Sequence, residues 1–294
     1  MRQIVTAGDF LDNNFLSNDG RVPVTLLQTN ACSPLATNAI GNNIWDNFSS
    51  ASYKQLPSVG AITIYDPFTG QPRQYQMPAG GRGYTRVPSL ISLWSTAPFL
   101  LNNSVGKFDP SPSVEARMGV FQDSITKMLW PEKRDKDKVL GDKIPGVIDR
   151  TTTTSWLRIP TGYLPDGLKT SRAALNWLVP VFDQKGIEIG PIPAGTPVDL
   201  LANFDPLPPS GAGLRERLGH DKAVIKVVAL LLRDLKALPK GATDEQARTV
   251  FANAGEQLFV LSKCPDYVVN RGHYFGTQLS DADKQALIVF LKTF

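Results

Sequence analysis

The sequence has few of the side chains that bind transition metals. It contains two cysteines, Cys32 and Cys264, and two histidines, His220 and His273. Two cysteines do not make a disulfide framework, and the sequence does not decide whether they pair. Neither belongs to a Cys-x-x-Cys-His motif, so these residues contain no attachment site for c-type haem. The scattered positions of all four side chains also argue against a structural zinc site.

Long apolar runs and a strong net charge are missing as well. The most apolar run, 223–232, contains Lys226 and is too short to cross a bilayer, so we expect no membrane span. The first ten residues lack the apolar core of a secretory leader, and we expect no signal peptide in this chain. The net charge is only +4 and is not concentrated in one stretch, so a nucleic acid is not an expected partner.

Apolar residues, in contrast, are plentiful. They make up 42% of the 294 residues, enough for a substantial core. The 24 glycines and 23 prolines exceed the average share, which predicts much irregular structure. Three glycines cluster at 80–83, without the Gly-Lys-[Ser/Thr] ending of a phosphate-binding loop. Such glycines suit a backbone that passes close to a planar cofactor or an aromatic core.

The last 24 residues place a histidine directly before a helix. His273 lies in a loop flanked by glycines, and Ser280 is a good N-cap residue with Asp283 three positions later. One apolar stripe of the predicted helix comprises Leu287, Phe290, Leu291 and Phe294. By itself, His273 is better explained as a surface histidine in a loop than as a ligand. His220, near a predicted helix start, is better explained as a solvated neighbour of that cap.

Other patterns predict further elements along the chain. Alternation around a turn predicts a hairpin over 61–76, and 156–160 predicts an edge strand. The mixed charges of 131–138 predict a solvated loop. A Thr-Pro pair predicts a helix that starts with Thr196 as its N-cap. The predicted helices are 113–130, 171–178, 198–204, 221–238 and 243–263.

Two stretches, 87–106 and 271–294, resemble the di-haem cytochrome c peroxidase superfamily and its rubber-oxygenase-like branch. The first is similar to a Pro-x-Leu-(x)-Thr-Ala-Pro-[Tyr/Phe]-x-His-[Asp/Asn]-Gly-Ser-Val segment that wraps a haem edge, and the second to the terminal histidine loop and helix. The resemblance implies a mainly α fold with cytochrome-c-like helices, long irregular loops and a small β-hairpin. It implies a loop-rich, peroxidase-like haem-wrapping region at 1–195 and a helical cytochrome-c-like region at 196–294, or one continuous domain.

The resemblance also implies a function in electron transfer. The chain would bind haem c whose covalent anchor lies on a haem-bearing N-terminal part or on a partner chain. His273 would be an axial ligand of the haem iron, with Met77 as an alternative ligand. Small electron-transfer proteins would be partners, in the periplasm or outside the cell. The other implied cofactor-binding residues are Arg82, Tyr84, Trp94 and Phe99.

One departure from the family pattern bears on catalysis. Leu101 stands where many family members carry a histidine, which puts a peroxidase activation step in doubt. Peroxidase or oxygenase activity would need the haem-bearing part to be present. A second hypothesis is therefore a haem-free binding or scaffold module that kept the cytochrome framework and lost the cofactor. The missing Cys-x-x-Cys-His motif favours this second hypothesis.

Overall fold

The computed structural model describes residues 20–31, 54–100, 102–160, 186–208 and 211–294, with side chains omitted at 186–187. Of the predicted elements, the helix at 171–178 lies outside the described residues. In chain order, the elements are β1 (Arg21–Pro23), α2 (Val24–Leu27), β2 (Ala61–Tyr65), β3 (Pro72–Gln76), β4 (Tyr84–Arg86), η1 (Leu93–Ser95), α6 (Val114–Leu129), η2 (Pro131–Lys133), β5 (Ser155–Pro160), β6 (Gly186–Ile192), α9 (Val198–Ala202), α10 (Leu214–Lys236), α11 (Asp244–Asn253), α12 (Gly255–Val260) and α13 (Asp281–Leu291).

The predicted fold class, mainly α with cytochrome-c-like helices, is wrong. The structure is 37% helical and 17% strand, and its strands form small sheets. Three antiparallel pairs, β1 with β4, β2 with β3 and β5 with β6, account for the sheets among the described residues. Isolated bridges, such as the one between Ile148 and Val268, tie loops together elsewhere. The backbone polar groups of a chain rich in Gly and Pro are thus satisfied by short pairings as well as by helices.

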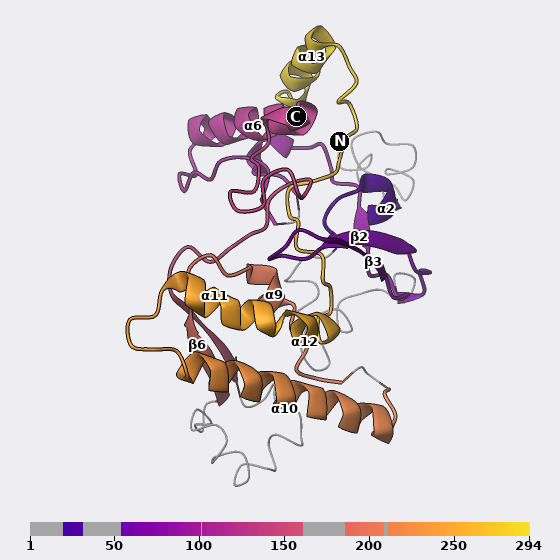
Figure 1. Cartoon of the computed structure of the whole chain (residues 1–294). Coiled ribbons are helices and arrows are strands. Elements are labelled where there is room, and N and C mark those ends of the chain that lie inside the picture. Colours follow the sequence, from indigo (N-terminus) through magenta and orange to yellow (C-terminus); the bar gives the residue numbers. More distant parts are fainter. Residues whose placement is uncertain (1–19, 32–53, 101, 161–185, 209–210) are drawn as a thin grey trace.

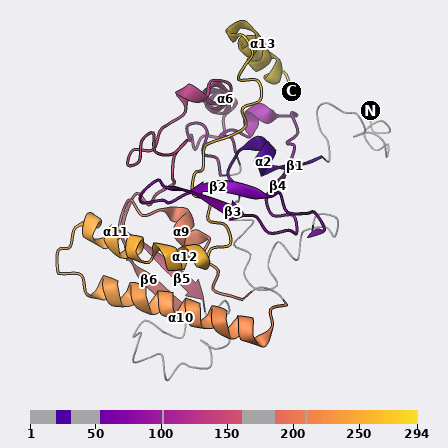
Figure 2. The same ribbon diagram turned by 45° about the vertical axis from the view of Figure 1, so that its right-hand side comes forward.

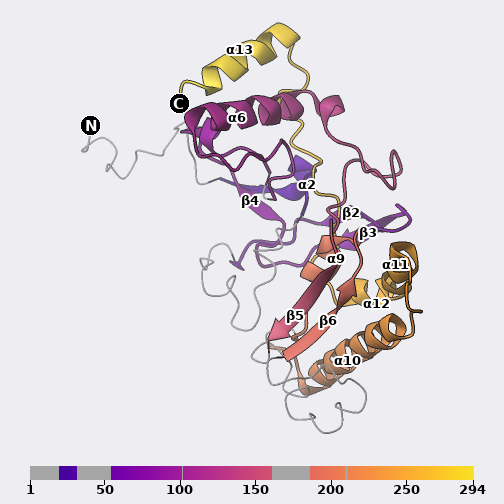
Figure 3. The same cartoon turned by 90° about the vertical axis from the view of Figure 1, so that its left-hand side faces the viewer.

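The largest core lies between the β5–β6 hairpin and the helices α9 to α12 (Figures 1 and 3). The helix α10 runs alongside the hairpin, and α11 packs on α10. Strand residues Ile159, Ile189 and Ile192 meet Val228 and Phe251 of the helices in one buried cluster. Leu140, Ile144 and Ile148 from the preceding loop join the same cluster. This core therefore extends across the expected boundary at 195.

A second core lies at the opposite end of the molecule, where α13 packs on α6 (Figure 1). Phe121, Ile125 and Leu129 of α6 pack with Ile288 and Leu291 of α13. The segment before α6 contributes a buried Ala97 and half-buried Leu93, Trp94 and Phe99. The C-terminal helix is thus held by the first half of the chain, and not by α10 to α12.

The β2–β3 hairpin lies between these two parts (Figure 2). Its register pairs Ala61 with Gln76 and Tyr65 with Pro72, as the alternating sequence predicts. Ile62 and Ile64 point into a third core cluster together with Met77 and Cys264. Cys264 is disulfide-bonded, and Cys32 lies outside the described residues.

Helix starts were predicted best. The side chains of Ser113 and Ser280 accept hydrogen bonds from the backbone of Ala116 and Asp283, and cap α6 and α13. Thr243 and Gln246 form the predicted capping box of α11. The predicted bounds of three other helices need correction. Pro197 takes the N-cap of α9 in place of Thr196, α10 starts seven residues before 221, and a break at Ala254 divides 243–263 into α11 and α12.

In the described parts of the chain, no helix combines the length and apolarity that a bilayer crossing requires.

Candidate functional site

An apolar cavity of about 370 Å³ lies where the two family-like stretches meet. Its walls come from the segment 85–103, from α6 and from the loops around Asn30 and His273. The exposed surface of the wall is mostly apolar, although eight of the sixteen lining residues are polar, and such a mixture is typical of a small-molecule site. The lining residues are Thr29, Asn30, Thr85, Arg86, Pro88, Leu90, Leu93, Thr96, Pro98, Phe99, Leu100, Asn102, Asn103, Ile125, Met128 and His273.

His273 is placed in this cavity by an unusual backbone. Its φ of 54° and the φ of 83° at Gly272 put two consecutive residues in the left-handed region. The backbone N–H of His273 donates a 2.8 Å hydrogen bond to the carbonyl oxygen of Leu27. The left-handed region costs a residue with a Cβ about 1 to 2 kcal/mol, so the surrounding contacts must hold this loop in place.

The imidazole of His273 is a nitrogen donor without a protein partner. Its Nδ1 is buried and has no hydrogen-bond partner. Burial, and secondly the positive charge of Arg134, lower the pKa of His273 from its ordinary value. The ring is therefore neutral at pH 7, and a neutral imidazole is the form that binds a metal ion. A buried nitrogen without a partner is costly in a folded protein.

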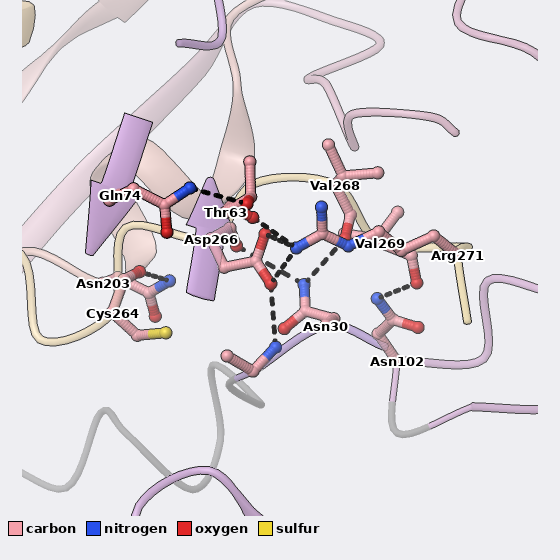
Figure 4. A network of polar contacts seen from close by, with 11 residues as sticks. Asn30, Thr63, Gln74, Asn102, Asn203, Cys264, Asp266, Val268, Val269 and Arg271 are labelled. Carbon is pink, nitrogen blue, oxygen red and sulfur yellow. Dashed lines mark hydrogen bonds and ion pairs between the residues drawn. The ribbon is translucent and has the colours of Figure 1, made fainter. Parts of the chain in front are cut away.

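The loop before His273 is fixed by hydrogen bonds from distant parts of the chain. The side chains of Asn102 and Ser104 donate to the carbonyl of Val269 at 3.2 and 2.6 Å (Asn102 in Figure 4). Asn270 donates through Nδ2 to the carbonyl of Asp135 and accepts through Oδ1 from the backbone of Val147. The segment 102–104, which belongs to the first family-like stretch, therefore holds the residues that lie directly before the second one.

A buried ion pair fixes the same loop from the other side (Figure 4). Arg271 donates from Nη2 to both carboxylate oxygens of Asp266 at 2.9 Å, and the Asp266 side chain is fully buried. Arg271 Nη2 also donates to the carbonyl of Thr63 in β2. The backbone N–H of Ala31 donates to Asp266, and Asn30 donates to the carbonyls of Asp266 and Val268. Breaking this buried ion pair would leave an uncompensated charge, so the pair keeps the loop in one position.

Arg134 connects α6 to the histidine loop. Its Nη1 donates to the carbonyls of Asn270 and Gly272 at 3.1 and 2.8 Å, and its Nε donates to the carbonyl of Lys127 at 2.8 Å. Its guanidinium also lies 5.5 Å from the centre of the Tyr274 ring. The prediction that 131–138 is simply a solvated loop is therefore wrong at Arg134, whose donors hold backbone carbonyls on both sides.

Of the predicted cofactor-binding residues, the structure brings together only His273 and Phe99. Both line the cavity, and Phe99 packs edge-on against Phe121 of α6. Trp94 donates from Nε1 to the carbonyl of Phe294 and does not line the cavity. The other predicted residues, Arg82, Tyr84 and Met77, are not among the lining residues either.

These three residues have different surroundings. Met77 is 1% exposed and is part of the third core cluster, where it fills space. Tyr84 pairs with Pro23 in the β1–β4 ladder, although its neighbours Thr85 and Arg86 do line the cavity. Arg82 lies near Asp205, whose pKa is raised by burial, and the charge of Arg82 is one of several that oppose this rise. Leu101, at the position of the missing histidine, lies outside the described residues.

Sequence reasoning missed several walls of the cavity. Met128 and Ile125 were assigned to the buried face of a helix, and they do lie on the inner side of α6, but that side also faces the cavity. Arg86 belongs to no recognisable motif, so the sequence did not identify it as a lining residue. His220 does not line the cavity. Its Nε2 lies 3.0 Å from the carbonyl oxygen of Asp205. In the described ranges, no cluster of three or more His, Cys, Asp or Glu side chains could bind a metal ion.

Comparisons with known proteins give no relative for this chain. No protein-family model, no curated protein and no solved structure matches it.

Proposed function

We propose that this chain supplies a histidine ligand and an apolar pocket to a haem, and that it functions in electron transfer. The observation that carries the proposal is His273. Its neutral imidazole lies in the wall of an apolar cavity, and its buried Nδ1 has no hydrogen-bond partner. Haem iron takes one or two axial ligands, and histidine is the commonest of them.

The residues of the cavity suit such a group. His273 would coordinate the iron, and Phe99, Leu93 and Met128 would pack on the apolar faces and edges of the macrocycle. Arg86 is the one cation in the wall and would be the partner for a carboxylate of the cofactor. Bound haem would supply one-electron redox chemistry. The chain's own part is to bind the macrocycle, to orient the imidazole and to exclude water from the iron.

The covalent anchor of the haem would lie outside these residues, on an N-terminal part or on a partner chain. Small electron-transfer proteins would be the partners in turnover. An oxidising compartment, the periplasm or the cell exterior, agrees with Cys264, which is disulfide-bonded. Peroxidase or oxygenase chemistry would need the complete haem-bearing protein.

A haem c peptide tests the ligand role of His273 directly. Such a peptide contains Cys-x-x-Cys-His with haem attached, so it brings its own anchor and one axial histidine and leaves the other axial position open. We expect titration of the peptide with this chain to convert its Soret spectrum from high spin to low spin. The His273→Ala variant should leave the peptide high spin, and added imidazole should restore the low-spin spectrum in that variant.

The matched control is His220→Ala, which removes the other histidine, outside the cavity. This variant should behave as the wild-type chain does. An equal low-spin conversion by His273→Ala and wild type, or loss of the conversion in His220→Ala alone, would contradict the assignment. Thermal melting of each variant without the peptide reports whether the fold is intact.

The second function is a haem-free binding or scaffold module. The mostly apolar wall of the cavity favours it, because such a cavity binds apolar ligands in general. The same variants separate the two functions when an apolar fluorescent probe replaces the peptide. If the probe binds equally to wild type and His273→Ala, while the haem c peptide gives no spectral change with either, the haem-free function is the correct one.

A further inference from the structure

A second cavity, of about 300 Å³, lies beside the β2–β3 turn. Two arginines line it, Arg150 from the loop before β5 and Arg248 from α11. Pro67 and Phe68 of the hairpin turn form an apolar wall opposite α11. The remaining lining residues are Val139, Gly195, Glu245, Thr249 and Ala252. No residue is shared with the histidine cavity.

Arg150 is buried with incomplete partners. Its side chain is 13% exposed, and its Nε is buried without a hydrogen bond. Its Nη2 donates to the carbonyl of Pro67 at 3.1 Å, while its Nη1 reaches the carbonyl of Gly195 only at 3.5 Å. The nearest carboxylate oxygen, of Asp137, is 3.7 Å away, beyond the length of a direct hydrogen bond. That carboxylate already accepts from three backbone N–H groups.

Arg248 adds a second positive charge to the same cavity. Its Nη1 donates to the carbonyl of Ala194 at 3.0 Å. Burial lowers the pKa of Arg150, Asp137 opposes this shift, and the positive charge of Arg248 adds a smaller lowering. Two guanidinium groups that face one cavity repel each other, and each loses hydration there. An anion between them would relieve the repulsion and use the remaining N–H donors. The fold uses some of these donors, because Arg150 forms an ion pair with the buried Asp137 and both guanidinium groups donate to backbone carbonyls, but it leaves Arg150 Nε without a partner.

We propose that this second cavity binds a small organic molecule that carries a carboxylate or phosphate group. The planar forks of Arg150 and Arg248 match the oxygen geometry of both groups. Phe68, Pro67 and Val139 would cover an apolar body attached to the anionic group. Glu245 also lines the cavity, and its negative charge would oppose the anion. The arginines therefore define the head-group chemistry, and the apolar wall defines the rest of the ligand.

Calorimetric titration with phenyl phosphate, benzoate and neutral benzamide tests this site. We expect saturable binding of at least one of the two anions and none of benzamide. The comparison between the two anions identifies the head group. The Arg248→Gln variant should bind the anion at least tenfold more weakly, because it keeps a polar side chain but loses both the positive charge and the guanidinium fork. Glu245→Gln should bind it about threefold more tightly.

The control is Arg158→Gln, which removes an exposed arginine that pairs with Glu188 away from this cavity. This variant should bind the anions as the wild type does. Arg248→Lys, which keeps the charge and loses the fork, should fall between wild type and Arg248→Gln. Equal binding of benzamide, equal affinities of wild type and Arg248→Gln, or no saturable binding of either anion would overturn the proposal. Melting curves without ligand identify a variant that fails to fold.

Discussion

At the residue scale, the position of His273 depends most on its neighbour Gly272. A Cβ built on Gly272 would lie 2.5 Å from the backbone of Leu27, Gln28 and Thr29. Only glycine allows this approach, and the approach is what lets His273 donate from its backbone to Leu27. The glycine therefore serves both the left-handed turn and the close contact with the strand–helix segment at the N-terminal end of the described chain.

We predict that Gly272→Ala destabilises the protein by about 3 kcal/mol or more. The left-handed φ would cost about 1 to 2 kcal/mol, and the new Cβ would also displace the backbone of 27–29. Urea unfolding followed by tryptophan fluorescence measures the change. The same variant should lose the low-spin conversion of the haem c peptide, because His273 moves with the loop.

Gly241→Ala is a matched control for this substitution. Gly241 has the same φ of 83°, and nothing lies within 4 Å of the Cβ that the substitution adds. Gly241→Ala should therefore lose only the part of the stability that comes from the left-handed φ, about 1 to 2 kcal/mol. Equal losses in the two variants would show that the contact with 27–29 does not hold the loop.

The single residues of the site were predictable only where a resemblance named them. His273 and Phe99 were identified in this way and do share the cavity. Arg134 was not, because a run of mixed charges is usually solvated, and nothing in the sequence shows that its donors reach the carbonyls of Asn270 and Gly272. Hydrogen bonds to backbone carbonyls depend on the fold, and leave no pattern of residue types.

At the element scale, helix starts are readable and buried faces are less so. Ser280 caps α13 as predicted, since the cap is a local interaction. The predicted apolar stripe of α13 is partly wrong, because Phe290 is 48% exposed and Ile288 is 1% exposed. Nearly every position in the second half of α13 is apolar, so periodicity alone cannot decide which of them face α6.

We predict that Ile288→Ala costs about 2 to 4 kcal/mol, because it leaves a cavity between α13 and α6. Urea unfolding measures this loss. Val289→Ala, at an adjacent position that is 64% exposed, should change stability by about 0.5 kcal/mol or less. If both variants lost the same stability, α13 would not dock on α6 through the face that the structure gives.

The strand β6 and the first turns of α10 show why other elements escaped prediction. The sequence Gly190-Pro191-Ile192-Pro193 suggests a linker, yet β6 extends to Ile192 and pairs with β5. The pairing buries Ile189 and Ile192 against the helices, and that tertiary burial outweighs the weak local preference. The first turn of α10 is polar and exposed at Arg215, Glu216 and Arg217, so it lacks the apolar period that indicated the rest of the helix.

At the scale of the whole molecule, 87–106 and 271–294 carry the two halves of one family resemblance, and the structure brings these stretches into contact through Trp94 and the carbonyl of Phe294. The mainly α fold was wrong, because helices were read from local patterns while the short strand pairings depend on distant segments. The loop 266–273 connects several distant segments, and neither the family resemblance nor the periodicity of the sequence predicted this role. It joins β2 through Arg271 and Thr63, and joins the segment 102–104 through Val269 (Figure 4).

A buried carboxylate makes the stability of the whole molecule depend on pH. Asp199 of α9 is 4% exposed, and burial, with smaller contributions from the charges of Asp149 and Asp266, raises its pKa to about 7. The ordinary pKa of this group is 3.8, so the folded state binds more protons than the unfolded state between about pH 4 and pH 7. Stability therefore falls as the pH rises through this window, by up to about 4 kcal/mol from Asp199 alone.

Asp199→Asn removes this titration and keeps the shape of the side chain. We predict that the variant unfolds with nearly the same free energy as wild type below pH 4, where both side chains are neutral in both states. Above pH 7 the variant should be more stable, because wild type must then hold a buried charge. Urea unfolding at intervals from about pH 3 to pH 8 measures the difference, and subtraction removes the other titrating groups shared by both proteins. Parallel curves across this range would mean that Asp199 is ionised at little cost, and that the core around α9 admits water.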